Sequence, residues 1–383
     1  MVQPNLPPQY RVYAGFFIYA ATLGAIYPRL GDLQLQMDIS EGTLGVSLMG
    51  AALGTQISLM FSGPLLEKVG YRTALIVCIP ILGFAEVAAT MAPTPLIFFV
   101  CLLGAGLAIG ALEIMINLEA DRTEHLIGRR IMNRSHAFWS FGFFAAGIVS
   151  SLVVPFGIAP TPHILGMTLV SSVAMFLVFK NFTPAPGRVT EAVDRPKFVR
   201  PTGPILLIVA FTLSAMLLEG AGADWSVIFM RDTHDLAPYL NTLAFAVGAL
   251  AQAITRYFAD RLVERFGPGR VARLLITVLG CGVVMVTFSV NGYMALLGFG
   301  LLGVGSSALF PLAMSAAAQR TDRPAATNVA ALAQLSFVTF LVAPPLLGVV
   351  AEHFGIRASF GICIPMVLVS WFTVYSLDPK RNG

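Results

Sequence analysis

Long runs of apolar residues, separated by short polar segments, repeat along the whole chain of 383 residues. An α-helix needs roughly 20 mostly apolar residues to cross the hydrocarbon core of a bilayer. Twelve runs approach or exceed that length and keep most of their charges at their ends. The pattern therefore predicts twelve membrane spans, at 11–33, 43–66, 71–91, 95–118, 134–155, 162–181, 204–230, 238–260, 271–290, 292–316, 326–351 and 357–377.

These runs predict helices rather than the strands of a transmembrane barrel. Barrel strands are about ten residues long and alternate apolar with polar positions, whereas these runs are longer and uniformly apolar. The composition agrees, because 56% of the residues are hydrophobic and only 11% are charged. Soluble globular proteins lie well outside that range. We expect an all-α polytopic membrane protein whose first span is retained, since residues 1–10 have no signal-peptide features.

The basic residues predict the orientation of the spans. If both termini are cytoplasmic, every Lys and Arg except Arg29, Arg231 and Arg357 falls on the cytoplasmic side. Cytoplasmic loops of membrane proteins carry an excess of Lys and Arg, so this asymmetry supports both the orientation and the even number of spans. The net charge of +4 follows from this topology and indicates no nucleic-acid partner.

The chain divides near its middle. A polar, proline-rich and basic segment follows the sixth span, which predicts a cytoplasmic linker at 182–203 between two six-helix bundles, 1–181 and 204–383. The segments EKVG (67–70) and ERFG (264–267) follow corresponding spans and are offset by 197 residues. An offset of about half the chain favours a duplicated six-helix unit.

The two related loops also predict a role. An acid and a base at neighbouring helix ends can lock two helices together, and a glycine permits a tight turn between them. One copy of this short pattern is weak evidence, because EHFGIR (352–357) matches it in an outer loop. The loop residues expected to lock the inner side are Gly63, Glu67, Lys68, Gly70, Arg72, Asp260, Arg261 and Gly267.

Twelve spans, a central linker and the loop GPLLEKVGYR (63–72) together resemble the major facilitator superfamily of transporters, over the whole chain. The usual Asp-Arg pair of its loop motif is Glu67-Lys68 here. The phrases YPRLGD, RSHAFWSFG, EGAGADWS and APPLLG are most similar to the bacterial YbjJ-like branch. The resemblance implies a transporter of the bacterial inner membrane, and it names no substrate. Drug/proton antiporters of this superfamily carry an Arg in the fourth span and a Gly-Pro pair in the fifth, and both features are missing.

Four acids lie inside predicted spans, where an ionised side chain costs roughly 2.5–3.5 kcal/mol to insert. They are Glu86, Glu113, Glu219 and Asp224. Glu219 is near the middle of the seventh span, where low dielectric disfavours its ionised form and suits it to load and release a proton. The alternative is a structural acid hydrogen-bonded to Gln252 in the eighth span.

Asp224 should lie on another face from Glu219, about 140° around a regular helix, unless Gly220 and Gly222 let the helix unwind. Subtracting the repeat offset places Asp224 opposite position 27 of the first span, close to Arg29. We therefore predict that Arg29 and Asp224 form substrate contacts or an outer gate. Arg29 could instead pair with Asp32 one helical turn away, or with an anionic group of the substrate.

Other polar residues extend this candidate site. Glu113 and Asn117 share a helix face, and Glu113 could be a second titrating site or the partner of a basic loop residue. Trp225 could form an apolar wall of the ligand site beside Asp224, or it could anchor the helix at the membrane surface. Asn117 and Gln252 are candidate polar lining residues, while Glu86 is expected to be structural.

These observations predict a secondary transporter that works by alternating access and moves a small polar organic solute with protons. We expect a monomer in the lipid bilayer, with no cofactor. Single cysteines and scattered histidines argue against disulfides and metal sites, and no ATP-binding motif or catalytic set indicates an enzyme. The alternatives are a proton-antiport exporter of amphipathic drugs and, outside transport, a membrane scaffold or receptor.

Overall fold

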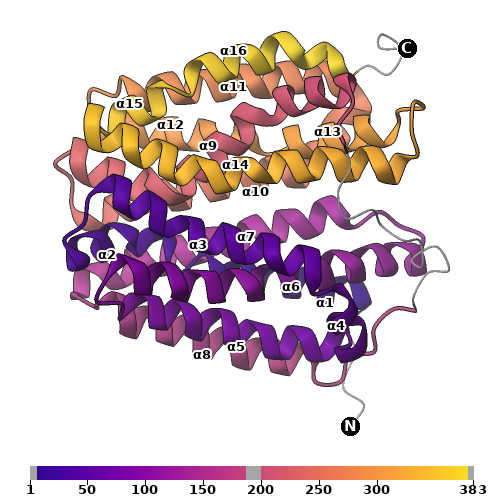
Figure 1. Cartoon of the computed structure of the whole chain (residues 1–383), viewed down its shortest axis with the longest axis horizontal. Coiled ribbons are helices and arrows are strands. Elements are labelled where there is room, and N and C mark those ends of the chain that lie inside the picture. The colour runs from indigo at the N-terminus through magenta and orange to yellow at the C-terminus, as the bar shows by residue number, and fades with distance from the viewer. Residues whose placement is uncertain (1–6, 187–199, 378–383) are drawn as a thin grey trace.

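The computed structural model describes residues 7–186 and 200–377, except for the side chains of Pro64, Glu67, Ala326 and Phe337. This part of the chain is helical throughout, as the sequence predicts (Figure 1). Its first helices are α1 (Pro8–Leu23), η1 (Tyr27–Arg29), α2 (Leu30–Met37), α3 (Glu41–Phe61), α4 (Gly63–Val69), α5 (Tyr71–Thr90), α6 (Pro95–Ile127), α7 (Met132–Val153), η2 (Val154–Phe156) and α8 (Pro160–Phe179). The remaining helices are α9 (Gly203–Thr233), α10 (Pro238–Phe266), α11 (Pro268–Thr287), α12 (Gly292–Ser306), α13 (Leu309–Ala318), α14 (Ala325–Phe354), α15 (Ile356–Gly361), α16 (Ile364–Thr373) and η4 (Val374–Leu377).

Eleven stretches of the described residues are long and apolar enough to cross a membrane, and they correspond to the second through twelfth predicted spans. The first predicted span, 11–33, is interrupted. Helix α1 ends at Leu23, and a 3-10 turn that contains Pro28 leads into α2. Because proline has no backbone N–H, it favours such an interruption. The interruption places Arg29 at the last position of the turn.

A second interruption divides the predicted span 292–316 between α12 and α13. In an α-helix the carbonyl of Ser307 would accept a hydrogen bond from residue 311, but Pro311 has no N–H to donate. The carbonyl of Ser307 is therefore left for another donor.

In contrast, α9 continues through Gly220 and Gly222 without unwinding, so Glu219 and Asp224 do lie on different faces.

The helices form two groups, α1–α8 and α9–α16, which lie one above the other in Figure 1. We name two ends of the molecule: the linker end, where α8 ends and α9 begins, and the far end, where residues 38–40 join α2 to α3. The predicted linker 182–203 falls largely on residues 187–199, which lie outside the described part of the chain.

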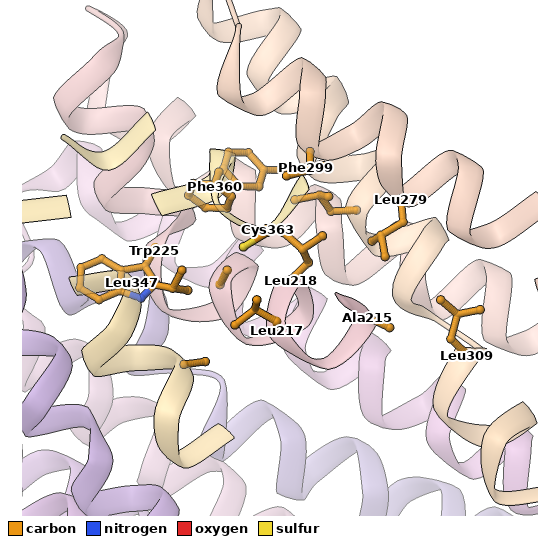
Figure 2. Packing of buried hydrophobic residues seen from close by; sticks show 14 of the residues in the cluster. Ala215, Leu217, Leu218, Trp225, Leu279, Phe299, Leu309, Leu347, Phe360 and Cys363 are labelled. Atoms are coloured by element: carbon orange, nitrogen blue, oxygen red, sulfur yellow. The ribbon is translucent and has the colours of Figure 1, made fainter. Parts of the chain in front are cut away.

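Two helix pairs, α7 with α10 and α3 with α14, join the groups along a seam. At the α3–α14 crossing the backbones touch, because a Cβ added to Gly45 would collide with the carbonyl oxygen of Pro344. A Cβ added to Gly348 would likewise collide with the carbonyl oxygen of Glu41. Glycine is therefore required for this close approach. Within the second group, Trp225, Phe299, Leu347 and Phe360 pack in the core around α9 (Figure 2).

The repeated loops have the same backbone conformation. Gly70 and Gly267, which are 197 residues apart, have φ angles of 78° and 81°. Such positive φ values favour glycine strongly. Gly355, in the third copy of the pattern, has a φ of 83°. The short pattern therefore specifies a turn between two helices at either end of the molecule.

Candidate functional site

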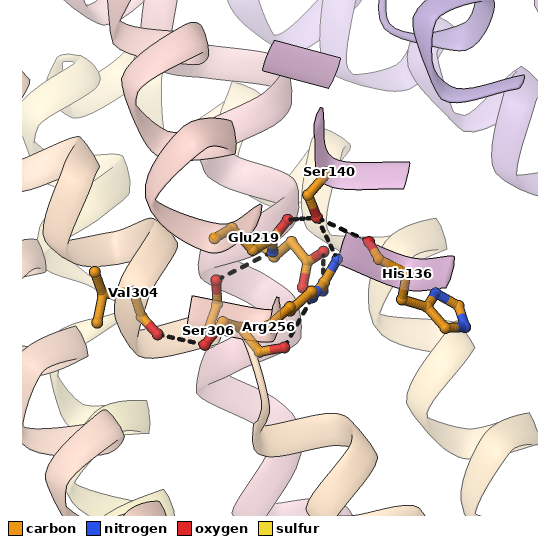
Figure 3. Close-up of polar contacts among 8 residues, drawn as sticks. His136, Ser140, Glu219, Arg256, Val304 and Ser306 are labelled. Carbon is orange, nitrogen blue, oxygen red and sulfur yellow. Dashed lines mark hydrogen bonds and ion pairs between the residues drawn. The ribbon is translucent and has the colours of Figure 1, made fainter. Parts of the chain in front are cut away.

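An ion pair lies near the middle of α9. Arg256 Nη2 donates to Glu219 Oε1 at 3.1 Å, across the contact between α9 and α10 (Figure 3). The side chains are 12% and 24% exposed, respectively, so both are largely removed from solvent. A Cβ added to Gly222, one turn from Glu219, would meet no atom within 4 Å, which leaves open space beside this part of α9.

The same arginine connects three further elements. Its Nε donates to the carbonyl oxygen of Ser307 at 2.8 Å, so it uses the acceptor that the interruption between α12 and α13 leaves free. Its Nη1 donates to Ser140 Oγ at 2.9 Å, and Ser140 belongs to α7 of the other group. The guanidinium carbon lies 5.8 Å from the ring centre of Trp139, also on α7. Arg256 therefore ties α9, α10 and the α12–α13 junction to the opposite group.

Gln252 completes the cluster but does not contact Glu219. Ser140 Oγ is 3.0 Å from Gln252 Oε1, and Gln252 Nε2 lies 3.5 Å from Ser306 Oγ. The sequence predicts no basic partner for Glu219, because Arg256 counts there among the basic residues of the cytoplasmic side. The signal was present, since Arg256 is inside the predicted span 238–260 and one turn after Gln252.

Arg29 is 4% exposed and pairs with Asp32, with 2.6 Å between Nε and Oδ2. Its Nη2 donates to the carbonyl oxygen of Ile158 at 2.8 Å. In this conformation it therefore forms the alternative pair that the sequence allowed, and not an ion pair with Asp224.

Asp224 makes no hydrogen bond and no ion pair among the described residues. Asp224 interacts electrostatically with Tyr27 on η1, the residue that the repeat offset places opposite it. Trp225 is 0% exposed and packs against Leu347 and Gly348 of α14 (Figure 2). The structure therefore does not bring Trp225 into the cluster around Arg256.

Glu113 belongs to a separate cluster within the first group. Tyr19 Oη donates to its Oε1 at 3.2 Å, and Asn117 Nδ2 donates to its Oε2 at 2.8 Å. Glu113 therefore contacts two neutral donors, and not the basic loop residue that the sequence allowed as its partner. Glu86 on α5 is 1% exposed, and its Oε2 has no hydrogen-bond partner among the described residues.

At the far end, two side chains of the second group hold the corner between α2 and α3. Arg231 donates to the carbonyl oxygen of Gly31 at 2.9 Å and to Gln34 Oε1 at 2.8 Å. Glu352 Oε2 accepts from Ser40 Oγ at 3.0 Å and from the backbone N–H of Gly42 at 3.2 Å. A carboxylate at the N-terminus of α3 interacts favourably with the free N–H groups there. The sequence alone predicts no gating role for Arg231 or Glu352.

At the linker end, Asn133 of α7 donates to Asp260 of α10, which brings one predicted loop residue into a contact between the groups. Arg134 lies 5.7 Å from the ring centre of Tyr257 across the same pair of helices. Lys68, Arg72 and Arg261 are exposed, and an added Cβ at Gly63 would meet nothing within 4 Å. The side chain of Glu67 lies outside the described part.

Two titratable groups beyond the spans have shifted pKa values. Burial and the charge of Arg357 both lower the pKa of His234, whose Nε2 is 2.9 Å from Ser289 Oγ at the far end. Burial raises the pKa of Asp322, but hydrogen bonds from Arg320 and Asn328 outweigh it and hold that pKa below its usual value. His234 is therefore neutral and Asp322 ionised near neutral pH.

Comparison with known families identifies the architecture. A family model described as the Major Facilitator Superfamily matches residues 12–338 and 210–383. The chain belongs to the major facilitator superfamily. Members of this superfamily are membrane transporters, so the chain is a multi-pass membrane protein and a secondary transporter rather than an enzyme.

Individual relatives agree with the superfamily assignment. An uncharacterized MFS-type transporter of Yersinia pestis is 27% identical over 372 residues, which cover 96% of this chain and 95% of the relative. Membrane protein MosC of Rhizobium meliloti is 23% identical over 375 residues, 96% of this chain and 89% of the relative.

Solved structures show the same fold. A mutant of the nucleoside transporter NupG superposes with a TM-score of 0.75 and 13% identity, covering 97% of this chain and 99% of that one. A D-xylose–proton symporter superposes with a TM-score of 0.76 and 12% identity, covering 98% of each chain. At this identity the likeness concerns the major facilitator fold alone.

Proposed function

We propose that the protein is a proton-coupled transporter that moves a small polar organic solute by alternating access. The observation that carries the proposal is the ion pair of Glu219 and Arg256, because the same arginine also donates to Ser140 across the seam. A change in the charge of one carboxyl group is thereby linked to a contact between the two groups of helices.

The coupling step follows from the bonds of Arg256. A proton on Glu219 would neutralise the carboxylate and leave the arginine charge without its counterion. An uncompensated charge in a low-dielectric site is unfavourable, so the guanidinium would have to leave Glu219 for another acceptor. Its bond to Ser140 would then be strained or lost, which favours movement of α7 relative to α10. Glu113, held by Tyr19 and Asn117, is a second candidate for proton binding.

We propose that the linker end faces the cytoplasm of a bacterial cell, in the inner membrane, and that the chain works as a monomer of two six-helix bundles, 1–181 and 204–383. The positions of the basic residues support this orientation. The far end would then be the outer gate, held by Arg231 and Glu352, with Arg29 and Asp32 close by. The linker end would be the inner gate, held by Asn133 and Asp260. The YbjJ-like branch remains the resemblance that the sequence phrases support.

The names of similar transporters favour a small polar solute. Solved structures with the same fold include a nucleoside transporter, a D-xylose–proton symporter and a fucose–proton symporter. Two of these three names state coupling to protons. Gln252, Asn117 and Asp224 supply polar groups of the kind that would bind such a solute.

Proton flux in proteoliposomes tests the proposal. The purified chain is reconstituted with a pH-sensitive dye inside, and a panel of sugars, nucleosides, amino acids and amines is added outside. We expect one class of solute to drive proton movement in the wild-type chain and Glu219→Gln to abolish that coupling.

The control is Asp235→Asn, which removes an exposed acid beyond the C-terminal end of α9. It should couple as the wild type does. A Glu219→Gln variant that carries the solute with undiminished proton movement would contradict the assignment of Glu219.

A further inference from the structure

Asp224 is an acid within a membrane span that no described residue neutralises. It is only partly exposed, on a continuous helix, and it makes no hydrogen bond or ion pair in the described part of the chain. Ionised side chains at this depth are normally paired or mark the path of a substrate or ion. The lack of a partner therefore calls for an explanation.

The basic side chains in this part of the molecule are already engaged. Arg29 binds Asp32 and the carbonyl oxygen of Ile158, and Arg256 binds Glu219. Arg231 lies two turns along the same helix, but its donors are taken by Asp232, Gly31 and Gln34. Among the described residues, each of these three guanidinium groups is paired with another carboxylate, so none of them pairs with Asp224 in this conformation.

The surroundings add a second acid and several aromatic faces. Asp224 and Glu86 both interact electrostatically with Tyr27. Ala223, the residue before Asp224, packs in the same apolar cluster as Tyr27, Phe143 and Phe245. Neither acid forms an ion pair among the described residues. The ring centre of Tyr27 is 5.7 Å from that of Phe143 and 5.9 Å from that of Phe245. These two rings come from opposite sides of the seam, on α7 and α10.

We propose that the transported solute carries a positive charge, an ammonium group that binds Asp224 against the faces of these aromatic rings. This deepens the proposed function and rests on it. An ammonium group satisfies a carboxylate by a charge-assisted hydrogen bond and is attracted to aromatic faces. Because Phe143 and Phe245 belong to different groups, separation of the groups would expose their faces and closure would bring them together around the solute.

Binding in detergent tests the charge preference without requiring transport. The probes are two matched pairs: choline with its neutral isostere 3,3-dimethyl-1-butanol, and glucosamine with glucose. Tryptophan fluorescence and the midpoint of thermal unfolding report binding. We expect at least one cationic probe to bind about tenfold or more tightly than its neutral partner. Asp224→Asn should remove that preference, and Asp224→Glu should restore part of it.

Asp235→Asn is the control, because Asp235 is an exposed acid just beyond the end of α9. The Asp235→Asn variant should prefer the cationic probe over its neutral partner as strongly as the wild type does. Without probe, each variant must unfold at the wild-type temperature. Equal binding within both pairs overturns the proposal. So does an Asp224→Asn variant that keeps the preference and loses only proton movement, since Asp224 would then carry a proton. A chain that binds the cationic probe but moves no protons in proteoliposomes contradicts the proposed function instead.

Discussion

At the residue scale, the structure distinguishes the membrane acids by their partners. Glu219 has a full positive charge beside it, Glu113 has two neutral donors, and Asp224 has no hydrogen-bond or ion-pair partner among the described residues. The sequence predicted the acids, because charges stand out in apolar runs. It could not predict their partners, since these come from other helices. Tyr19 is aromatic and does not stand out within an apolar run, and Arg256 lies close enough to the end of its predicted span to resemble a loop residue.

The ion pair predicts a specific pattern of stabilities. Arg256→Gln leaves Glu219 without its counterion, and loss of one partner of a buried pair costs roughly 3–5 kcal/mol. We expect the lower end of that range, because Glu219 is about a quarter exposed. The double variant Glu219→Gln with Arg256→Gln should recover part of the loss, since no charge is left uncompensated.

The measurement is the midpoint of thermal unfolding in detergent, at one fixed heating rate for all variants. Arg265→Gln, an exposed arginine on the same helix, serves as the control and should change little. Additive losses in the double variant would show that the two side chains are not coupled in the way the structure indicates.

At the element scale, interruptions of helices matter as much as the helices themselves. The spans were predictable from hydropathy, and the second through twelfth are confirmed. Neither interruption was predicted, because residues 24–26 and 306–308 are small or apolar and the hydropathy stays high across them. Pro28 and Pro311 were the available signals. A proline alone is not sufficient, however, since Pro80 lies within the continuous helix α5.

The junction between α12 and α13 predicts an effect of Pro311→Ala. The new N–H could bind the carbonyl oxygen of Ser307, which would extend the helix and take the acceptor from Arg256. We expect slower hydrogen exchange at residues 307–312. We also expect Arg256→Gln to cost less stability in this background than in the wild type.

Pro80→Ala provides the matched comparison, because it adds a backbone N–H inside the continuous helix α5, which makes no hydrogen bond with Arg256 among the described residues. It should leave the cost of Arg256→Gln unchanged. If Pro311→Ala also leaves that cost unchanged, the Ser307 carbonyl does not contribute to holding Arg256.

At the scale of the whole molecule, contacts across the seam occur at both ends in this conformation. Arg231 and Glu352 hold the far end, and Asn133 contacts Asp260 at the linker end. Alternating access requires each end to open in turn, so the two sets of contacts cannot both persist through a transport cycle.

We therefore expect cross-links between the two groups to stop transport, and a cross-link within one group to leave it unchanged. Cysteine pairs at Ser40 and Glu352, or at Asn133 and Asp260, joined by a short bifunctional thiol reagent, should each stop uptake of the solute identified by the proton-flux panel. Cleavage of a reducible linker should restore it. The control pair is Thr90 and Thr161, whose hydroxyl oxygens are 2.9 Å apart on α5 and α8 of one group. A joined control pair should still transport, and undiminished uptake by either joined pair across the seam would contradict rigid movement of the two groups.

The glycine crossing of α3 and α14 has a consequence for the energetics of closure. Where side chains separate two helices, rotamers can adjust and the gap can vary continuously. At Gly45 and Gly348 the backbones themselves touch, and backbone atoms have no rotamers with which to adjust. The van der Waals attraction between these backbone atoms acts only over a short range. It is strongest at contact and falls steeply once the helices move apart by about an ångström. The far end should therefore have two stable states, closed and open. A half-closed state should be populated only briefly during the change between them.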